Sequence, residues 1–419
     1  MRLLLALALS LVSFQDPVPD NPVALLRTGQ DQKAPLKIGD SIYQAIGFGN
    51  TFLVVTKAGT VVIDTSLAAN APRHRQLLSS INTGPIKYII LTHAHGDHAG
   101  GVDLWKQAGT EVIAQRNHVD FMNYQARLNG FFAARNAAQF GMQIPRPAAW
   151  PGNAGGRVLA TTLFDDKYEF ELGGLKFVVM STPGETPDHL TVWIPELKAA
   201  FVGDNYYESF PNIYTLRGTQ PRWALDYVSS LNKVLALKPE VVLPSHGLPI
   251  QGNAEVTKRL TRYRDAIQYV HDETVKGMNA GKDVFTLMNE IKLPANLDIG
   301  ESYGKLSWSI RGIYEGYVGW FDLNPATMYE KPISSVYGDI VKLAGGPDPV
   351  VKLAAEKANS DPVEALYLTD AALTASAGHR GALEVRLKAL EVLRAQCRNS
   401  NERGWLDASI NETKARMAR

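Results

Sequence analysis

The 419-residue sequence predicts an α/β domain built as a sandwich, followed by an all-helical domain. Two observations predict the sandwich. Short β-rich segments alternate with helical ones, and the arrangement occurs twice, each time ending in a strand that precedes a cluster of polar residues. A third observation is that nearly every segment after Ala254 has helical periodicity. A single hydrophobic core rarely grows beyond about 300 residues, so a chain of this length is expected to form two domains.

The first half of the α/β domain begins with antiparallel strands and continues in strand, helix, strand order. Gly and Asn residues separate its first three strands at hairpin distances. The expected strands are Ser41–Gly47, Thr51–Thr56, Thr60–Asp64 and Lys87–Leu91, with a helix at Pro72–Ile81. The second half is expected to contain strands Tyr168–Leu172, Lys176–Ser181, Leu190–Ile194, Ala199–Gly203 and Glu240–Pro244, with a helix at Trp223–Ala236. Two such halves suggest a functional site along one edge of the sandwich.

A long insertion separates the two halves. Val119–Met142 is expected to be helical, and Ile144–Gly156 is rich in Pro, Gly and Asn. A long insertion over a site usually forms a lid or a substrate wall. The helical domain is expected over 300–419 and has the character of a packing or dimerisation module. The expected helices of this part of the chain are Glu255–Asn279, Asp348–Lys357, Pro362–Ala377, Gly381–Asn399 and Glu402–Met417.

Composition excludes several classes of function. The 43 Lys and Arg residues balance 42 Asp and Glu residues, so no overall field attracts polyanions and nucleic acid is not an expected partner. The single cysteine, Cys397, excludes a disulfide framework and a Cys-rich zinc site, so any metal must bind to His and carboxylate side chains. We expect Cys397 to be a structural residue of a C-terminal helix, and a reactive thiol is the alternative.

The N-terminus predicts export. Arg2 precedes an apolar run from Leu3 to Val12, which has the length of a signal-peptide core and is too short to span a bilayer. We therefore predict a signal peptide over 1–15 and a periplasmic or secreted protein. A short uncleaved anchor and a mis-assigned start are the alternatives. No later run reaches about 18 apolar residues, so no stable membrane span is expected.

The strongest chemical signal is a histidine-rich segment directly after the last strand of the first half. Three imidazoles and one carboxylate lie within six residues, in the run Thr92-His93-Ala94-His95-Gly96-Asp97-His98. After a strand, this spacing directs His93 and His95 to one side, whereas the glycine turn directs Asp97 and His98 to another. One segment can therefore serve two adjacent metal positions. Its ligands suit Zn²⁺, and Mn²⁺ or Fe accept the same donors.

This segment resembles the His-x-His-x-Asp-His signature of the metallo-β-lactamase superfamily. The resemblance implies the αβ/βα sandwich of that superfamily and three further metal ligands, each placed after a later strand. The sequence contains a candidate for each, namely Glu185 in the segment Thr182–His189, Asp204 in Val202–Asn205 and His246 in Leu243–Gly247.

Glu185 points to one family within the superfamily. Most members place a histidine at this position, whereas the alkyl sulfatases place a glutamate. His189, four residues later, is the alternative ligand, although many members have a supporting histidine there. The run Asn212-Ile213-Tyr214-Thr215-Leu216-Arg217-Gly218 is similar to a segment of the alkyl sulfatases whose Asn and Arg are implied to hold the sulfate group.

The resemblance to alkyl sulfatases extends from Lys37 to the C-terminus. It implies a catalytic domain over 37–295 and a dimerisation domain over 300–419. The segments Tyr317–Asp322 and Asn324–Ala326 resemble the start of the dimerisation domain of the family. A homodimer is therefore expected.

The resemblance also implies a mechanism. His93, His95 and Glu185 are implied to hold one zinc ion, Asp97, His98 and His246 a second, and Asp204 both. Two such cations lower the pKa of a shared water from about 15.7 towards 7, so a metal-bound hydroxide attacks the sulfate ester. Asp97 and Arg217 are the expected catalytic residues, and Asn212 and Arg217 are expected to bind the substrate.

Two of these assignments have structural alternatives. Arg217 suits a tetrahedral oxyanion because its planar fork donates two parallel hydrogen bonds, but a surface ion pair is its alternative role. Asp64 resembles the aspartate of the superfamily that orients a metal-binding histidine, and capping of a turn is the alternative.

Other residues carry weaker signals. Arg135, on the inserted helix, is expected on a solvated helix face, with substrate contact as the alternative. His74, His118, His271 and His379 are expected to be structural or exposed, without partners.

The sequence differs from the alkyl sulfatases in several places, and these differences limit what the resemblance implies about the substrate. Phe140 stands near the place where the family has a tyrosine and cannot donate a hydrogen bond. The final histidine segment lacks a second histidine, and the sequence ends before the sterol-carrier-like domain of many members, which makes a long-chain substrate less expected than a short one.

Another hydrolase of the same scaffold, such as a phosphodiesterase, lactonase or β-lactamase, is the alternative function. A non-catalytic zinc- or anion-binding protein is a further alternative.

Overall fold

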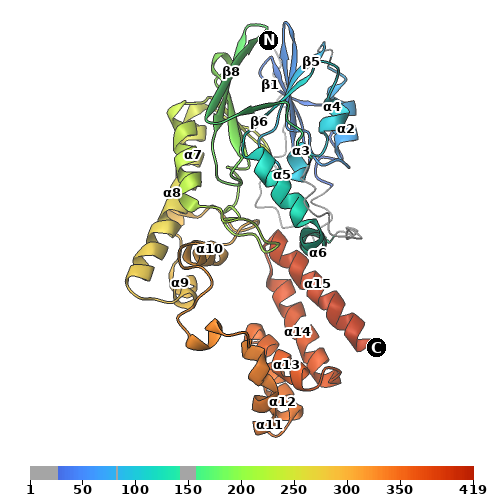
Figure 1. Cartoon of the computed structure of the whole chain (residues 1–419), viewed down its shortest axis with the longest axis vertical. Coiled ribbons are helices and arrows are strands. Elements are labelled where there is room, and N and C mark those ends of the chain that lie inside the picture. The colour runs from blue at the N-terminus through green and yellow to red at the C-terminus, as the bar shows by residue number, and fades with distance from the viewer. Residues whose placement is uncertain (1–26, 82–83, 142–156) are drawn as a thin grey trace, which may run out of the picture.

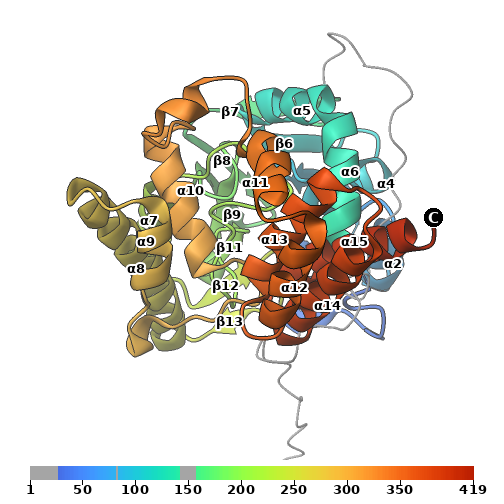
Figure 2. The same cartoon turned by 90° about the horizontal axis from the view of Figure 1, so that it is seen from below.

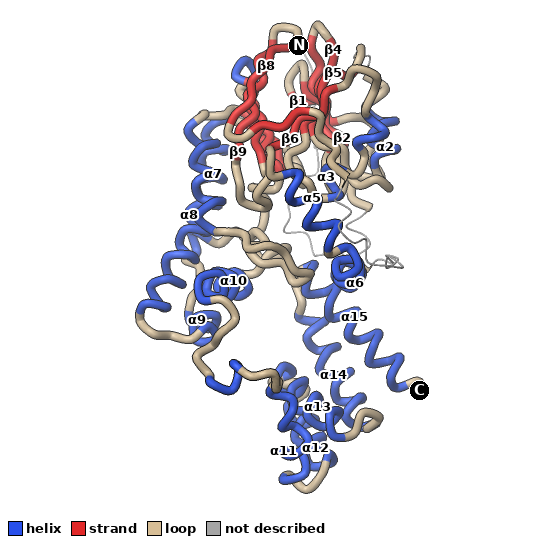
Figure 3. Tube along the Cα trace, in the orientation of Figure 1, coloured by secondary structure: helices blue, strands red, loops and turns tan. Residues whose placement is uncertain are grey.

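The computed structural model describes residues 27–81, 84–141 and 157–419. The predicted signal peptide and the Pro- and Gly-rich segment 144–156 lie outside the described residues. Figure 1 shows an elongated molecule with the strands gathered at one end and helices at the other. Figure 3 shows the same separation by colour.

The α/β domain is a sandwich of two mixed sheets, which confirms the predicted fold class. The first sheet has seven strands in sequence order, antiparallel from β1 to β4 and parallel from β4 to β7. Its strands are β1 (Leu36–Ile38), β2 (Ile42–Ala45), β3 (Thr51–Thr56), β4 (Gly59–Ile63), β5 (Ile86–Ile90), β6 (Glu111–Gln115) and β7 (Thr162–Phe164).

The second sheet has six strands in the order β13-β12-β11-β10-β9-β8. Its pairs are antiparallel except for β11 with β12. The strands are β8 (Lys167–Leu172), β9 (Leu175–Ser181), β10 (Leu190–Ile194), β11 (Ala199–Gly203), β12 (Val241–Pro244) and β13 (Ile250–Gln251).

The main core lies between the two sheets. Phe52, Ile63 and Ile90 of the first sheet pack there with Val192 and Phe201 of the second. The rings of Phe52 and Phe201 meet edge to face at 5.2 Å between centroids. The sequences of these strands are continuous apolar runs because both faces of each strand are covered.

Helices cover the outer faces of both sheets. On the first sheet lie α2 (Ala71–Leu78) and α4 (Val102–Trp105), whose Leu78 and Trp105 pack on Val62 and Ile89. On the second sheet lie α7 (Ala224–Ala236) and α8 (Asn253–Asn279), followed by α9 (Val284–Glu290) and α10 (Leu306–Val318). The sequence did not predict β6, β7, α9 or α10 as elements.

The inserted segment forms two helices rather than one. These are α5 (His118–Arg127) and α6 (Asn129–Phe140), which are separated at Leu128. Both lie at the end of the sandwich that faces the helical part of the molecule (Figure 1).

The last helices form a separate layer with its own small core of Val341, Val350 and Leu383. They are α11 (Tyr337–Leu343), α12 (Pro347–Lys357), α13 (Pro362–Ala375), α14 (Arg380–Gln396) and α15 (Ser400–Met417). Figure 2 shows this layer in front of the sheets, with α15 beside α6. Among the described residues, no helix combines the length and apolar character needed to cross a bilayer.

Candidate metal centre

The loop after β5 brings four candidate ligands to the edge of the sandwich. His93 and His98 are fully buried, and His95 is 7% exposed. The short helix α3 (Gly96–Ala99) starts directly after His95, whose backbone is extended. The change from extended to helical backbone separates the directions of His93 and His95 from those of Asp97 and His98, as the spacing predicted.

The structure brings the seven predicted ligands together. Asp97, His98, Asp204 and His246 form one group of convergent side chains, and His93, His95 and Asp204 form another. Asp204 follows β11 and belongs to both groups. Its Oδ2 lies 3.7 Å from His93 Nε2, 3.3 Å from His98 Nε2 and 3.2 Å from His246 Nε2.

Glu185 lies beside the group of His93, His95 and Asp204. Its Oε1 lies 3.7 Å from His95 Nδ1. Its Oε2 faces away from the cluster and accepts hydrogen bonds from Arg222 Nη1 at 2.7 Å and from the Tyr227 hydroxyl at 2.8 Å. These two bonds hold the carboxylate with one oxygen directed towards the histidines.

His189 is not available as the alternative ligand. Its Nε2 accepts a hydrogen bond from the backbone N–H of Asp204 at 3.0 Å, so the ring proton is on Nδ1, which donates to Thr182 O at 2.9 Å. Burial lowers the pKa of His189 to about 4, which keeps the ring neutral. His189 therefore supports the backbone of Asp204.

Asp64 orients the ligand His98. Asp64 Oδ2 accepts hydrogen bonds from His98 Nδ1 at 2.9 Å and from the hydroxyls of Thr92 and Ser245, and Asp64 Oδ1 accepts from Thr92 N. Because His98 Nδ1 donates to Asp64, His98 Nε2 faces the cluster. Asp64 has a φ of 55°, a left-handed conformation that is unusual for a residue with a side chain.

The Thr92 hydroxyl orients His93 in the same way. It donates to Asp64 and lies 3.1 Å from His93 Nδ1, so it accepts the Nδ1 proton. The lone pair of His93 Nε2 is then directed towards Asp204.

The electrostatics of the cluster favour a bound cation. Burial lowers the pKa values of His93 and His95 well below the ordinary range, which keeps both rings neutral. Burial opposes the ionised form of Asp204, but the neighbouring His246 and His98 outweigh it and hold the pKa of Asp204 well below its usual range. His98 Nε2 and Asp204 Oδ1 are buried without a hydrogen-bond partner among the described residues. A divalent cation fits this set of imidazole and carboxylate donors.

Of the two predicted sulfate-binding residues, Arg217 lies beside the cluster. Arg217 Nη2 is 3.3 Å from His95 Nε2. The side chain of Asn212 is buried, and its Oδ1 has no hydrogen-bond partner among the described residues. The backbone carbonyl of Asn212 accepts from Arg222 Nη1 at 2.9 Å, so the arginine that holds Glu185 also holds this segment.

A cavity of about 150 Å³ opens at Arg217 and His95. It lies between α5 and α6 and has both aromatic and amide side chains in its wall. The aromatic residues are Phe121, Tyr124 and Phe132, and the amide residues are Gln125, Asn129 and Asn136.

Two family models match the chain. The metallo-beta-lactamase superfamily model matches residues 45–246, and the alkyl sulfatase dimerisation model matches residues 285–415. The chain belongs to the alkyl sulfatase family of the metallo-β-lactamase superfamily.

Several alkyl sulfatases are similar to this chain in sequence or in structure. A linear primary-alkylsulfatase of a Pseudomonas strain is 29% identical over 392 residues, which are 87% of this chain and 74% of the relative. An alkyl/aryl-sulfatase of Saccharomyces cerevisiae is 26% identical over 76% of this chain but only 54% of its own length. The solved structure of the sec-alkylsulfatase Pisa1 from Pseudomonas has a TM-score of 0.82, with 22% identity over 91% of this chain and 65% of that one. The chain thus spans about half to three quarters of these relatives.

The expectation that Arg135 lies on a solvated face is wrong. Its Nε donates to Arg217 O at 2.6 Å and its Nη2 to Leu216 O, and its guanidinium lies over the Trp405 ring, 5.2 Å from the centroid. Arg135 is half-buried and holds the backbone of Leu216 and Arg217. Its spacing on α6 gave no sign of this, because the contact is to a loop about 80 residues away.

Three of the four histidines expected to lack partners form hydrogen bonds, and the ring nitrogens of His118 form none among the described residues. His74 Nδ1 is 3.0 Å from Thr51 Oγ1, His271 lies between Asp272 and Tyr317, and His379 caps α14. His118 is fully buried with its Nδ1 3.4 Å from Asp188 Oδ2. All four contacts are structural.

Two further residues take structural places. Phe140 packs on the ring of Phe48, which in turn meets the ring of His246. Cys397 is buried at the end of α14 with its Sγ 3.1 Å from Asn399 O.

Proposed function

We propose that this protein hydrolyses sulfate monoesters and that two divalent cations, zinc in the first instance, bind at the cluster. The observation that carries the proposal is the place of Arg217, a fixed positive charge 3.3 Å from the ligand His95 at the mouth of a cavity. An anionic group bound there lies next to the cations. The names of the relatives support a sulfate group as this anion.

The proposed ligand sets follow the two groups of side chains. His93, His95 and Glu185 hold one cation and Asp97, His98 and His246 the other, while Asp204 serves both. Two bound cations lower the pKa of a shared water, which supplies hydroxide near neutral pH.

The tautomer of the neutral His95 ring would decide what Arg217 contacts. A cation held by His95 through Nδ1 would leave the ring proton on Nε2, and Nε2 would then no longer accept from Arg217. The N–H groups of the guanidinium are then directed at the ester, where two parallel hydrogen bonds to sulfate oxygens orient the reacting group. Asn212 adds a neutral donor from the same segment.

Asp97 is the acidic ligand that solvent reaches most easily. Its side chain is 17% exposed, against 3% for Asp204 and 2% for Glu185. Burial opposes its ionisation, but His98 and His246 outweigh it and hold the pKa of Asp97 well below its usual range. An ionised Asp97 would accept a hydrogen bond from the attacking water, and this supports the catalytic role that we propose for it.

The cavity between α5 and α6 supplies the place for the alcohol part of the ester. Phe121, next to the His95 ring at 5.4 Å, leads from the cluster into the cavity. We propose short or medium alkyl and aryl sulfates as substrates.

Sulfate release from a panel of alkyl sulfates, aryl sulfates, phosphodiesters and lactones tests the proposal. We expect sulfate esters to be preferred and Arg217→Ala to lose activity by about a hundredfold or more while it retains its metal. Arg116→Ala removes an exposed arginine that pairs with Asp165 and serves as the matched control with full activity. A preference for phosphodiesters or lactones rejects the sulfatase function and leaves the metal centre intact.

We also propose that the chain forms homodimers through its helical part and is exported after removal of residues 1–15. The match to the alkyl sulfatase dimerisation model supports the dimer. The apolar run after Arg2 supports export.

A further inference from the structure

We infer that the last helix, α15, is part of the sulfate-binding site, because its first residues position both Asn212 and Arg217. The inference rests on the proposed function. The segment from Ser209 to Gln220 that carries the two residues contains no helix or strand. Its position therefore depends on tertiary contacts, and two independent sets of these lead back to α15.

The first set runs through α6 to Arg217. Gln139 is 1% exposed, and its Oε1 accepts from Arg217 N at 2.9 Å and from Trp405 Nε1 at 3.4 Å. Trp405 also packs on the guanidinium of Arg135, which donates to the carbonyl oxygens of Leu216 and Arg217. The α15 indole thus contacts both side chains that hold the backbone of Arg217.

The helix α15 packs directly against the backbone of α6 at Gly404. A Cβ at Gly404 would lie 1.9 Å from Gln139 O, which is far inside van der Waals contact. Only glycine permits this approach of the two helices. A glycine at position 404 is therefore required for this close packing of α15 on α6.

The second set runs through the loop 300–304 to Asn212. Asn399, the buried N-cap of α15, donates from Nδ2 to the carbonyl oxygens of Glu301 and Tyr303 at 2.8 and 2.9 Å. The Nδ2 of Asn401 donates to the same Tyr303 oxygen at 2.9 Å. This loop holds the segment before Asn212, since Gly304 N donates to Phe210 O at 2.9 Å and Phe210 N to Gly300 O at 2.8 Å.

The first route ends on the segment that is proposed to bind sulfate. The loop 300–304 also reaches a proposed metal ligand, because Tyr303 packs on Tyr207, whose hydroxyl donates to Asp204 Oδ2 at 2.6 Å. A change at Trp405 or Gly404, on the first route, is therefore expected to weaken sulfate binding and leave the metal in place. Because α15 lies within the residues matched by the dimerisation model, the helical part of the chain contributes to the site as well as to assembly.

The test uses the full-length zinc-loaded protein and inorganic sulfate as the probe. Sulfate affinity is measured by calorimetry, with zinc content, solution mass and the KM for a sulfate ester measured on the same samples. Trp405→Leu removes the indole contacts, and Trp405→Phe retains an aromatic face over Arg135. Gly404→Ala separates α15 from α6. Trp320→Leu, a change at a 75% exposed tryptophan of the helical part, is the matched control.

We expect Trp405→Leu to weaken sulfate binding about three- to tenfold and to raise KM similarly, with zinc content unchanged and Trp405→Phe closer to the wild type. Gly404→Ala has at least the same effect, and Trp320→Leu has none on sulfate affinity. Wild-type sulfate affinity and KM in Trp405→Leu and Gly404→Ala would overturn the inference, as would loss of zinc in step with loss of sulfate binding. If the wild type itself neither binds sulfate nor releases it from esters, the proposed function fails, and the inference fails with it.

Discussion

At the scale of single residues, the centre depends on the side chains that hold the ligands as much as on the ligands. Glu185 is the clearest case. Burial raises the pKa of its carboxyl, whereas the charge of Arg222 and the hydroxyl of Tyr227 favour the ionised form. Both partners bind Oε2, so Oε1 is left for a metal.

Tyr227→Phe tests this arrangement. The change removes one hydroxyl and keeps the ring in the core, so we expect the fold to persist and the affinity for the cation at His93, His95 and Glu185 to fall about tenfold. Competition with a chelator followed by metal analysis measures the effect. Tyr168→Phe, on β8 far from the centre, is the control, and equal metal affinity in the two variants would show that the hydroxyl is not needed.

The sequence predicted the candidate ligands and one supporting residue, Asp64, but not the supports of Glu185. The run 93–98 has recognisable spacing, and the resemblance to the superfamily supplied the three candidates after later strands. Arg222 and Tyr227 lie 37 and 42 residues from Glu185, within no motif. Whether such a contact forms depends on where α7 packs, and the periodicity of the sequence does not determine that position.

At the scale of elements, local patterns gave the strands of the sandwich and missed elements whose pattern is short or mixed. Three expected strands, Thr51–Thr56, Leu190–Ile194 and Ala199–Gly203, have the predicted bounds. By contrast, β6 was overlooked, although four of its five residues are buried. A short run buried on both faces has no alternation, so its sequence does not distinguish a strand from other buried structure.

The contact between α2 and β3 predicts a pH dependence of stability. Burial lowers the pKa of His74 to about 4, and its Nδ1 lies against Thr51. In the unfolded chain the imidazole takes up a proton as the pH falls below 6.5, while the folded protein remains neutral down to about 4. Protonation of the unfolded state alone lowers the free energy of unfolding across this window by about 1.4 kcal/mol per pH unit.

His74→Asn removes this group and keeps a hydrogen-bonding atom near Thr51. We expect the stability of the variant to fall less steeply between pH 6.5 and 4, by up to about 3 kcal/mol over the window, and to show no such difference above pH 7. Denaturant unfolding of both proteins at several pH values measures it. Parallel curves for the two proteins would mean that His74 does not titrate in this way.

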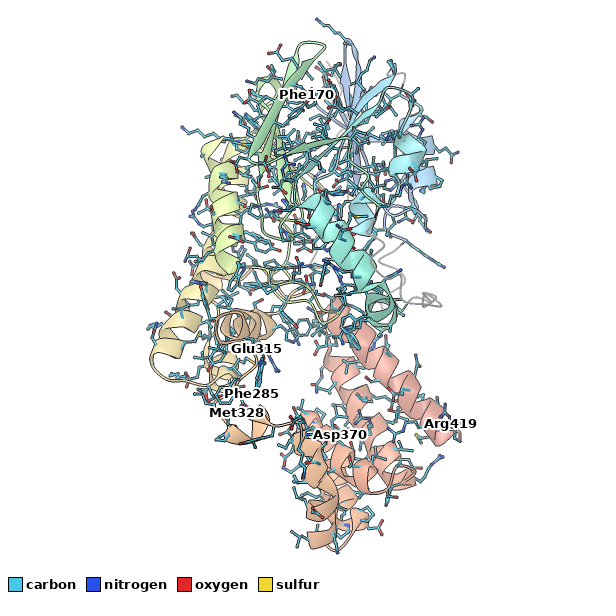
Figure 4. All side chains as sticks on the ribbon, viewed as in Figure 1. Phe170, Phe285, Glu315, Met328, Asp370 and Arg419 are labelled. Atoms are coloured by element: carbon cyan, nitrogen blue, oxygen red, sulfur yellow. The ribbon has the colours of Figure 1, made fainter. Side chains whose placement is uncertain are left out.

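At the scale of the whole molecule, the helical part carries several large apolar side chains that are mostly exposed. Its most exposed large side chains include Trp320, Leu323, Ile333 and Leu343, with exposed fractions from 75% to 87%. Phe285 and Met328, both labelled in Figure 4, are also more than half exposed. These exposed side chains support the proposed dimer interface.

A charge on this surface is expected to prevent assembly. We predict twice the chain mass for the wild type in solution and a single chain mass for Ile333→Lys with Leu343→Lys, measured by light scattering. Each replaced side chain is about four-fifths exposed in the chain itself, so the monomer is expected to remain folded. An unchanged dimer in the double variant would place the interface elsewhere.

The account depends most on the claim that seven side chains hold two cations. Anomalous X-ray diffraction at the zinc edge from crystals of the zinc-loaded protein tests it most directly. We predict two peaks per chain, one contacted by His93, His95 and Glu185 and one by Asp97, His98 and His246, with Asp204 in contact with both. A single peak, or peaks away from Glu185 and Asp204, would contradict the account.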